Sequence, residues 1–457
     1  MNPEDLQPET GTQASCSETA YRLVALGGCL VYYGTVALEI LRTGRMRPGV
    51  LERFGKYDPA LLRRLDAHQR PHIWMHATSM GESKVAMAVA EELRRRQPGV
   101  WVTVSTSTAT GQLAARSSTQ PPEMSIYYPV DLPGLVQKAV RRLRPHVYVI
   151  VEAEYFPHIM GAVRQQGVPV CVVNGSAPRL DGLFAHPRLL PYWRRGMQEV
   201  ACFGVIDQTE AQRLADFHVP AGRIRVLGNV KQAAIKPLGS LEEKQELRRR
   251  AGISPSDQLI VAGCTHDSEE APILKAFTSL LRGSQECRLV LVPRRLERLS
   301  AVQSVVARSG LSWSLHKGSP SRPDSQVTVI GDYGHLVEWY GAADVGIVCG
   351  SFVPGFGGHN PVEALGSGAR IVYGPYMREG DATLAMEGRG YAVRAGSSNE
   401  IALALCKMLA VQPEAGQLEY AQEIAEVGRR AAGAYADLLC EMLERRRLSL
   451  AAAAPVA

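Results

Sequence analysis

Short Val- and Ile-rich runs alternate with helical stretches along most of the chain, and this alternation constrains the fold more than any other feature. The first series comprises the runs HIWMHA, WVTVSTS, VYVIVEA and VPVCVVNG, with the helical stretches ESKVAMAVAEELRRR and LVQKAVRRLRP between them. A strand followed by a helix, repeated, is typical of a parallel sheet covered by helices on both faces. We therefore expect an α/β fold.

A second series of the same kind follows Lys231 and suggests a second domain. It comprises LIVAGCT, APILKAFTSLL, CRLVLVP, VTVIG, VGIVCG and RIVYG. Because 457 residues exceed one ordinary domain, two Rossmann-like halves are expected. We predict a polar tail and anchor over 1–44, a first Rossmann-like domain over 45–230, and a second over 231–457 that includes closing helices from about 399 to 448.

Composition narrows the function classes. Hydrophobic residues at 46% and charged residues at 21% exclude a disordered, collagen-like or polytopic membrane protein. The net charge of +6 is compatible with anionic substrates or a membrane surface, and nucleic acid is not required as a partner. The nine cysteines form no Cys-x-x-Cys pair, so a reducing cytoplasm is the simplest compartment.

An uncharged run near the amino terminus predicts a membrane anchor. Residues 23–38 read LVALGGCLVYYGTVAL, with Arg22 before the run and Arg42 and Arg45 after it. A full crossing needs about 20 apolar residues, so tilting or snorkelling of the flanking side chains would have to make up the difference. Apolar residues lie all round the expected helix, and the positive charge after it places residue 45 onward in the cytoplasm. An amphipathic core helix is the alternative.

A Gly-rich segment, VCGSFVPGFGGHNPVEALGSGARIVYGP, predicts a nucleotide site. A loop over 350–358 follows a strand, and a helix begins near Asn360, with Pro361 in its first turn. Exposed N–H groups and the helix dipole suit a phosphate, and Glu363 could accept hydrogen bonds from ribose hydroxyls. No Walker pattern and no G-x-G-x-x-G after the first strand is present, so ATP and NAD are poor candidates. The alternative is a tight turn only.

Four charged residues follow expected strands in the first half or lie at the junction between the halves. Glu82 in HATSMGES is placed to accept a proton, or only to complement a helix dipole. Glu152 and Glu154 have a spacing of two, which puts them on one side of an extended segment and allows either a glycosidase pair or a structural role. Lys231 in LGNVK could neutralise a leaving phosphate or a substrate carboxylate, or could be a solvated linker lysine.

Patterns for other chemistry are missing from the sequence. No His-Glu-x-x-His, Asp-x-Asp or Gly-x-Ser-x-Gly pattern occurs. We therefore predict no metal and no cofactor.

The ordered motifs resemble those of the 3-deoxy-D-manno-octulosonic acid (Kdo) transferases of lipopolysaccharide assembly. They are HATSMGES, STSTATGQ, YYPVD, VEAEYFP, LGNVK, AGCTHDSEE, VPRRLER and GGHNPVEALGSG, from about Arg53 to Met377. The resemblance implies a GT-B architecture, with two Rossmann-like domains facing across a cleft and an N-terminal membrane-associated helix. It also implies an inverting transfer of Kdo from CMP-Kdo to a lipid A precursor (lipid IVA), at the cytoplasmic face of a bacterial inner membrane.

The resemblance implies roles for individual residues as well. Glu82 would accept the proton, Glu152 and Lys231 would help to stabilise the transition state, and no metal would be required. The CMP half of CMP-Kdo would meet Pro293, Arg294, Gly334, His335, Leu336, Asn360, Pro361, Val362 and Glu363.

Some positions depart from the family's pattern. The family commonly has Trp at Phe156, Asn at His158, Ser at Cys264 and an acidic residue at His335, and its Asn-Ala-Arg is replaced here over 174–176. Two other functions stay open: an isomerase like the UDP-N-acetylhexosamine 2-epimerases, which share the GT-B frame but need neither acceptor nor anchor, and a non-catalytic membrane scaffold. The number of sugars transferred is also open.

Overall fold

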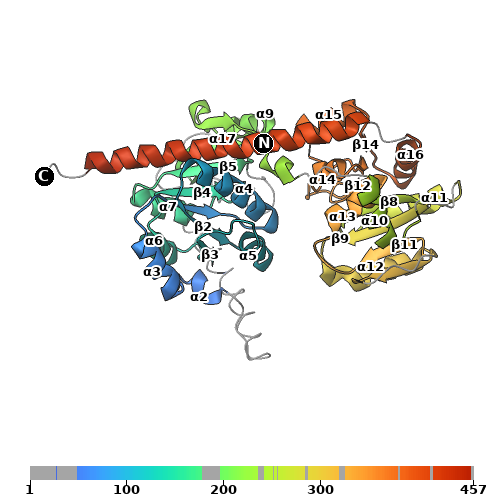
Figure 1. Ribbon diagram of the computed structural model, residues 1–457, viewed down its shortest axis with the longest axis horizontal. Helices are drawn as coiled ribbons and strands as arrows, with labels where there is room; N and C mark the ends of the chain where they lie inside the picture. The colour runs from blue at the N-terminus through green and yellow to red at the C-terminus, as the bar shows by residue number, and fades with distance from the viewer. Residues whose placement is uncertain are drawn as a thin grey trace, which may run out of the picture. The chain divides into compact units, whose positions relative to one another are not determined.

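The structure is a computed structural model of the chain, and its residues fall into two compact units. One unit comprises Met1–Lys231 and Arg429–Ala457, and the other comprises Gln232–Gly428. In the part of the chain that is described, each unit is built on a seven-stranded parallel sheet (Figure 1). The described residues are Gly27, 49–177, 196–234, 241–250, 252–254, 256–283, 287–318, 325–378, 381–411 and 415–453.

The first sheet has the strand order β3-β2-β1-β4-β5-β6-β7. Its strands are β1 His72–His76, β2 Trp101–Thr106, β3 Met124–Tyr127, β4 Val147–Val151, β5 Val170–Gly175, β6 Val200–Val205 and β7 Ile224–Val226. The register places Ile73 between Val102 of β2 and Val147 of β4. The strand order therefore reverses between β1 and β4, and ligand sites in open α/β sheets form at such a reversal, beyond the carboxyl ends of the strands.

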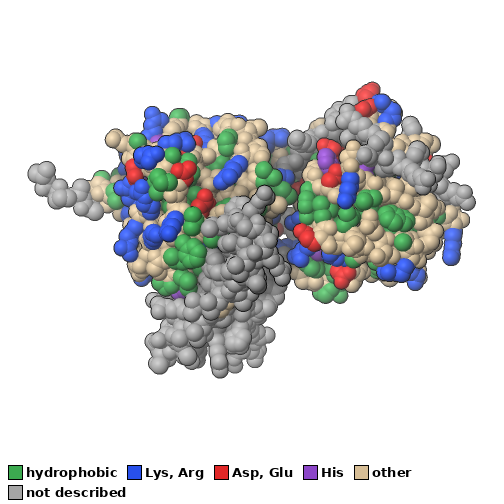
Figure 2. Space-filling model, turned by 90° about the horizontal axis from the view of Figure 1, so that it is seen from below, with side chains coloured by type: hydrophobic (Ala, Val, Ile, Leu, Met, Phe, Trp, Pro, Cys, Tyr) green, Lys and Arg blue, Asp and Glu red, His purple; other side chains and the backbone are tan. Residues whose placement is uncertain are grey.

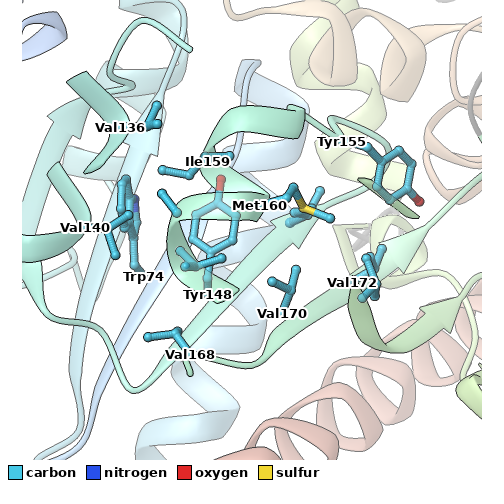
Figure 3. Packing of buried hydrophobic residues seen from close by; sticks show 14 of the residues in the cluster. Trp74, Val136, Val140, Tyr148, Tyr155, Ile159, Met160, Val168, Val170 and Val172 are labelled. Atoms are coloured by element: carbon cyan, nitrogen blue, oxygen red, sulfur yellow. The ribbon is translucent and has the colours of Figure 1, made fainter. Parts of the chain in front are cut away.

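Two apolar layers cover the faces of the first sheet, because side chains alternate between the two faces of every strand. One layer surrounds Trp74 and Tyr148, with Val136 of α6 and Ile159 of α7 packed on them (Figure 3). The other layer buries Ile73 and the apolar side of α4. The helices are α2 Val50–Arg53, α3 Pro59–Ala67, α4 Met80–Arg96, α5 Ala109–Arg116, α6 Pro133–Leu143, α7 Pro157–Gln165 and α9 Gln208–Asp216, with 3-10 segments η3 Ala221–Arg223 and η4 Val230–Ala234.

The last helix, α17 (Ala415–Ala453), contributes to the core of the first unit. Tyr435, Leu439 and Met442 are buried with Ile73 against the first sheet. From the sequence, all the closing helical residues are expected in the second domain, and the structure corrects this from Arg429 onward. The physical reason is burial, since each large apolar side chain removed from water contributes about 1.5 to 3 kcal/mol.

The second sheet has the order β10-β11-β9-β8-β12-β13-β14 and reverses between β8 and β12. Its strands are β8 Gln258–Thr265, β9 Cys287–Pro293, β10 Trp313–His316, β11 Val327–Ile330, β12 Val345–Val348, β13 Arg370–Tyr373 and β14 Ala392–Arg394. The helices are α10 Leu241–Arg250, α11 Glu270–Leu281, α12 Leu299–Arg308, α13 Leu336–Ala342, α14 Pro361–Gly366, α15 Asp381–Gly388 and α16 Ser398–Leu409, with the 3-10 segment η5 Leu296–Arg298.

Every apolar run that was predicted to be a strand forms one, which confirms the α/β fold in both halves. The expected anchor at 23–38 lies outside the described residues, apart from Gly27. Among the residues that are described, no helix combines the length and the apolar character that a membrane crossing requires.

Candidate active site

Glu82 lies at the carboxyl end of β1, in the first turn of α4. Ser79 is the N-cap of this helix and its hydroxyl accepts a hydrogen bond from the Glu82 backbone N–H at 3.4 Å. In return, the Glu82 carboxylate accepts from the Ser79 hydroxyl at 2.9 Å and from the Thr78 backbone N–H at 2.6 Å. The carboxylate thus reaches back to the residues that begin the helix, although not to the Ser79 N–H that a capping box would use, so the structural role that the sequence allowed for Glu82 is present.

The surroundings of Glu82 add a second property. Burial, reinforced by the nearby carboxylates of Glu152 and Glu154, raises its pKa to about 7. The capping box of α16 uses the same residue types, Ser397 and Glu400, and there the glutamate is exposed. Helix capping therefore does not require the burial seen at Glu82. A carboxylate with a pKa near neutrality is suited to general base catalysis.

Glu152 follows the last residue of β4 and has an unusual backbone conformation. Its φ is +69°, a left-handed value that is uncommon for a residue with a side chain, and its N–H donates to the Val173 carbonyl oxygen at 3.0 Å. The expectation of an extended segment through Glu152 and Glu154 is therefore wrong, because the chain turns directly after β4. Both carboxylates still raise the pKa of Glu82, which shows that the turn brings them near it.

Lys231 forms an ion pair with Glu152. Its Nζ lies 2.5 Å from the Glu152 Oε1, and its side chain keeps 37% of its accessible surface. A free linker lysine is thus excluded, although the partly exposed ammonium is still open to a substrate. Because β1 and β4 are neighbours in the sheet, the three expected catalytic residues meet at one edge of the first unit.

The loop that carries Lys231 is fixed by residues that sequence reasoning missed. The Asn174 side-chain oxygen accepts from the Val230 N–H at 2.8 Å, and Asn174 itself has a φ of +51°. The Tyr435 hydroxyl of α17 donates to the Gly228 carbonyl at 2.9 Å. The Asn in the motif VVNG was a usable signal, because asparagine tolerates the left-handed region better than most residues. Nothing local could have indicated Tyr435.

Two departures from the family's pattern lie beside this edge, one partly buried (Phe156) and one buried (His158). Phe156 is the N-cap of α7 and its ring lies 5.1 Å from that of Tyr128, which stacks on His76 at 3.8 Å. The His158 Nδ1 lies 2.7 Å from the Asp131 carbonyl oxygen, and the Asp131 carboxylate accepts from the His158 N–H. Both substitutions therefore have a packing role in this chain.

The residues expected to meet the donor nucleotide gather at one edge of the second sheet. Pro293 ends β9, and Arg294 follows it with its N–H bonded to the Thr265 carbonyl of β8. Gly334 and His335 lie between β11 and α13, and Leu336 is the first residue of α13. Residues 360–363 follow β12. Since β11, β9, β8 and β12 are consecutive in the sheet, their carboxyl ends share this edge.

Individual positions in that group differ in what they contact. Gly334 has a φ of +103° and His335, the N-cap of α13, has its Nδ1 3.2 Å from a Glu338 carboxylate oxygen. Leu336 packs on the core of the second unit and Val362 is buried in it. Asn360 caps α14 by accepting from the Val362 N–H at 3.1 Å, and Pro361 is the first helical residue, as expected. Glu363 is partly exposed in the first turn.

The Gly-rich loop is held by a carboxylate that the sequence analysis did not identify. The buried Glu269 accepts from the N–H groups of Gly350 at 2.8 Å, Phe352 at 3.0 Å and His266 at 2.8 Å. These N–H groups are therefore not available to a phosphate, which corrects part of the expectation for this loop. The six-residue α14 also supplies only a short helix dipole.

A histidine pair lies beside the same loop. The Nε2 atoms of His266 and His359 are 2.8 Å apart, with the rings stacked at 5.1 Å. When both rings are neutral, the Nε2–H of one histidine donates to the unprotonated Nε2 of the other. Among the described residues no cluster of three or more His, Cys, Asp or Glu side chains is placed to hold a metal ion.

The chain is similar to known proteins in both sequence and fold. Residues 49–234 match the family described as 3-deoxy-D-manno-octulosonic-acid transferase (kdotransferase). A 3-deoxy-D-manno-octulosonic acid transferase of Haemophilus influenzae is 25% identical over 75% of this chain and 78% of its own length. A glycosyltransferase structure from Rickettsia africae has a TM-score of 0.55 at 12% identity, covering 84% of this chain and 98% of its own.

A similar fold occurs in an isomerase. The UDP-GlcNAc 2-epimerase of Neisseria meningitidis, solved with UDP-GlcNAc bound, also has a TM-score of 0.55, at 14% identity, and covers 82% of this chain and 100% of its own. At such identities the structures establish a shared GT-B-like fold and nothing finer. The sequence relatives are more specific: a kdotransferase domain over 49–234 and relatives of 23–25% identity over two thirds or more of the chain support the 3-deoxy-D-manno-octulosonic acid transferase family of glycosyltransferases.

Proposed function

We propose that this enzyme transfers Kdo from CMP-Kdo to a hydroxyl of a lipid A precursor, lipid IVA, with inversion at the anomeric carbon. The observation that carries the proposal is the group of Glu82, Glu152 and Lys231 at one strand edge, with the pKa of Glu82 raised to about 7. Relatives named for Kdo transfer support the identity of the sugar.

Glu82 acts as the general base in this scheme. The acceptor hydroxyl donates its hydrogen bond to a free lone pair of the Glu82 carboxylate, while the Ser79 hydroxyl and the Thr78 N–H hold that carboxylate in place. As the hydroxyl oxygen attacks the anomeric carbon, its proton moves to Glu82. Attack on the face opposite the leaving group inverts the configuration.

Lys231 supplies positive charge to the same edge. Its ammonium is held by Glu152 and is partly exposed, so it can also pair with the carboxylate of the Kdo unit or with the departing phosphate. Glu152 fixes the position of the ammonium. Its own backbone is held in a left-handed turn, so the carboxylate has little freedom to move.

The second unit binds the donor nucleotide. The exposed guanidinium of Arg294 balances the phosphate charge that grows as CMP leaves, and Glu363 accepts hydrogen bonds from the ribose hydroxyls. Because Glu269 already occupies the N–H groups of Gly350 and Phe352, the phosphate depends on side chains more than on the Gly-rich loop.

We also propose that the run at 23–38 attaches the chain to the inner membrane, with both units on the cytoplasmic side. Basic side chains of α3 and α6 support contact with an anionic surface, and Figure 2 shows Lys and Arg side chains gathered on the face of the first unit. The basic residues in the sequence of α3 and α6 include Arg63, Arg64, Lys138, Arg141 and Arg142. A chain lacking 1–42 should stay folded and soluble without detergent, whereas insolubility of that chain would indicate a core helix.

The decisive experiment is transfer by the purified chain. It is incubated with CMP-Kdo and tetra-acylated lipid IVA, the lipid product is weighed by mass spectrometry, and the anomeric configuration is read by NMR. A mass increase by one or more Kdo units with CMP release supports the proposal, and the increment gives the number of sugars added. Release of CMP without a heavier lipid would show a different acceptor, and no turnover of CMP-Kdo would refute the donor.

A further inference from the structure

A cavity of about 370 Å³ lies in the first unit, at the edge of its sheet opposite Glu82. His72 begins β1, His146 precedes β4 and Val168 precedes β5, so the cavity opens at the amino-terminal ends of these strands. Arg446 and Leu450 of α17 close one side. All of its lining residues belong to the first unit, and none of them has a role in the proposed transfer.

The charges that line this cavity are mostly positive. Three arginines line it, Arg70, Arg144 and Arg446, against a single carboxylate, that of Asp66. Asp66 is already paired, because Arg144 contacts it at 2.7 Å and Arg142 at 3.0 Å. Within the described part of the chain, the guanidinium groups of Arg70 and Arg446 bond only to backbone carbonyls, those of Pro98 and Gln166.

Several polar nitrogens of the cavity lack a partner or have a free donor. The Arg446 Nε and the His68 Nε2 are buried without a hydrogen-bond partner. The His146 Nδ1 accepts from the His72 N–H at 3.1 Å, which leaves the proton of a neutral His146 on Nε2. Burial, Arg446 and His68 lower the pKa of His146, in keeping with the positive charge around it.

A metal ion does not fit this set. His68 and His72 have a spacing of four, but His72 is in a strand and both of its ring nitrogens are used, by the Leu143 carbonyl and the Thr103 hydroxyl. The arginines would also repel a cation. The opposite wall is apolar and is made by Leu65, Leu143, Pro145, Val168 and Leu450.

We propose that this cavity binds a phosphomonoester, with the phosphate on Arg70, Arg446 and the imidazoles and the organic part against the apolar wall. The phosphate group carries up to two negative charges and several acceptor oxygens, which match the converging cationic donors better than a carboxylate does. The ester can come from a soluble metabolite or from the headgroup of a phosphatidic acid. This site is separate from the transfer chemistry and does not depend on the function proposed above.

Binding is tested on the full-length chain at low salt with two probes, glycerol 3-phosphate by titration calorimetry and vesicles containing phosphatidic acid by cosedimentation. Arg446→Gln removes a lining cation, and Arg445→Gln is the matched control, since the neighbouring Arg445 is exposed and paired with Glu441. Loss of one charge-assisted hydrogen bond weakens affinity about 10-fold or more. Arg70→Gln is a second variant, at an exposed position, in case Arg446→Gln lowers the melting temperature.

We expect saturable binding of at least one probe, weakened about 10-fold by Arg446→Gln and Arg70→Gln but not by Arg445→Gln. Binding of glycerol 3-phosphate identifies a soluble ligand. If the chain binds only the vesicles, and Arg446→Gln abolishes this binding while Arg445→Gln keeps it, the ligand is a lipid headgroup. Membrane attachment through another segment would be the same in both variants. No saturable binding of either probe, or equal affinities of the two helix variants, would overturn the proposal.

Discussion

The ammonium of Lys231 lies 2.5 Å from the carboxylate of Glu152. Lys231 is the last residue of the first unit's N-terminal segment, and the ion pair connects it to the turn after β4. Because Glu152 is one of the charges that raise the pKa of Glu82, the three residues are electrostatically coupled. Changes at any one of them should therefore be visible in the titration of the proposed base.

Glu82→Gln should lower transfer about 10² to 10⁴-fold, because the amide keeps the shape of the side chain but cannot accept the acceptor's proton. CMP affinity, measured by calorimetry, should not change. Glu400→Gln is the control, since Glu400 occupies the same position in an exposed capping box. Equal activities of the two variants would assign Glu82 to helix capping alone.

The same substitution should not reduce stability at neutral pH. The folded-state pKa of Glu82, about 7, lies above its ordinary value of 4.5, so folding favours the protonated form. Wild-type stability then falls as pH rises from about 4.5 through 7, by up to about 3 kcal/mol, and is constant above that. In thermal melts of both proteins at pH 5 and pH 8, the melting temperature of the Gln variant relative to wild type should be higher at pH 8 than at pH 5. A relative loss at pH 8 would contradict the assignment.

Transfer should depend on pH through the same group. A general base works only when it is deprotonated, so kcat/KM should fall tenfold per unit as pH drops below about 7 and level off above it. The measurement is kcat/KM for the acceptor from pH 5 to 9 at saturating donor. A profile that stays flat down to pH 5 would exclude a base with this pKa.

Neighbouring substitutions should move that inflection in opposite directions. Glu152→Gln removes a negative charge near Glu82 and should shift the inflection to lower pH, whereas Lys231→Met leaves the Glu152 charge unneutralised and should shift it to higher pH. Shifts of about one pH unit are expected. Since both variants also lose activity, the midpoint of the profile is the readout, and identical midpoints would show that the residues do not interact with Glu82.

Glu363→Ala should weaken CMP binding by about 10 to 150-fold, the range for losing a charge-assisted hydrogen bond. Glu419→Ala is a suitable control because Glu419 is an exposed carboxylate in the second unit. Calorimetry with CMP distinguishes the two. If the Glu363 variant binds CMP with unchanged affinity, the Gly-rich segment is only a tight turn and α14 has no role in binding CMP.

Leu439→Ala should destabilise the first unit by about 2 to 5 kcal/mol, because its side chain is fully buried against the sheet and truncation leaves a cavity. Leu448→Ala on the same helix is the control, since Leu448 is 58% exposed. Denaturant unfolding followed by circular dichroism measures the difference. Similar midpoints for the two variants would show that α17 is not part of that core.

The strands that the sequence analysis did not predict occupy particular positions. β3 and β7 are the two edges of the first sheet, and β10 and β14 are the two edges of the second. All four are short, and β7, β10 and β14 are only partly buried, so they lack the continuous apolar run of a central strand. β6 lies next to the edge strand β7, and the small residues Ala201 and Gly204 make its sequence VACFGV a weaker apolar run than those of the central strands.

The sequence by itself determined the two α/β halves, the position of Glu82 after β1 and the start of α14 at Asn360, because these depend on local periodicity and capping. Only the tertiary structure decided that Lys231 pairs with Glu152, that Glu269 takes the loop N–H groups, and that α17 returns to the first core. Each of these joins residues far apart in the chain. Such contacts depend on which buried groups can hydrogen-bond, pair or pack with one another once the sheets have formed, and no short segment of sequence contains that information.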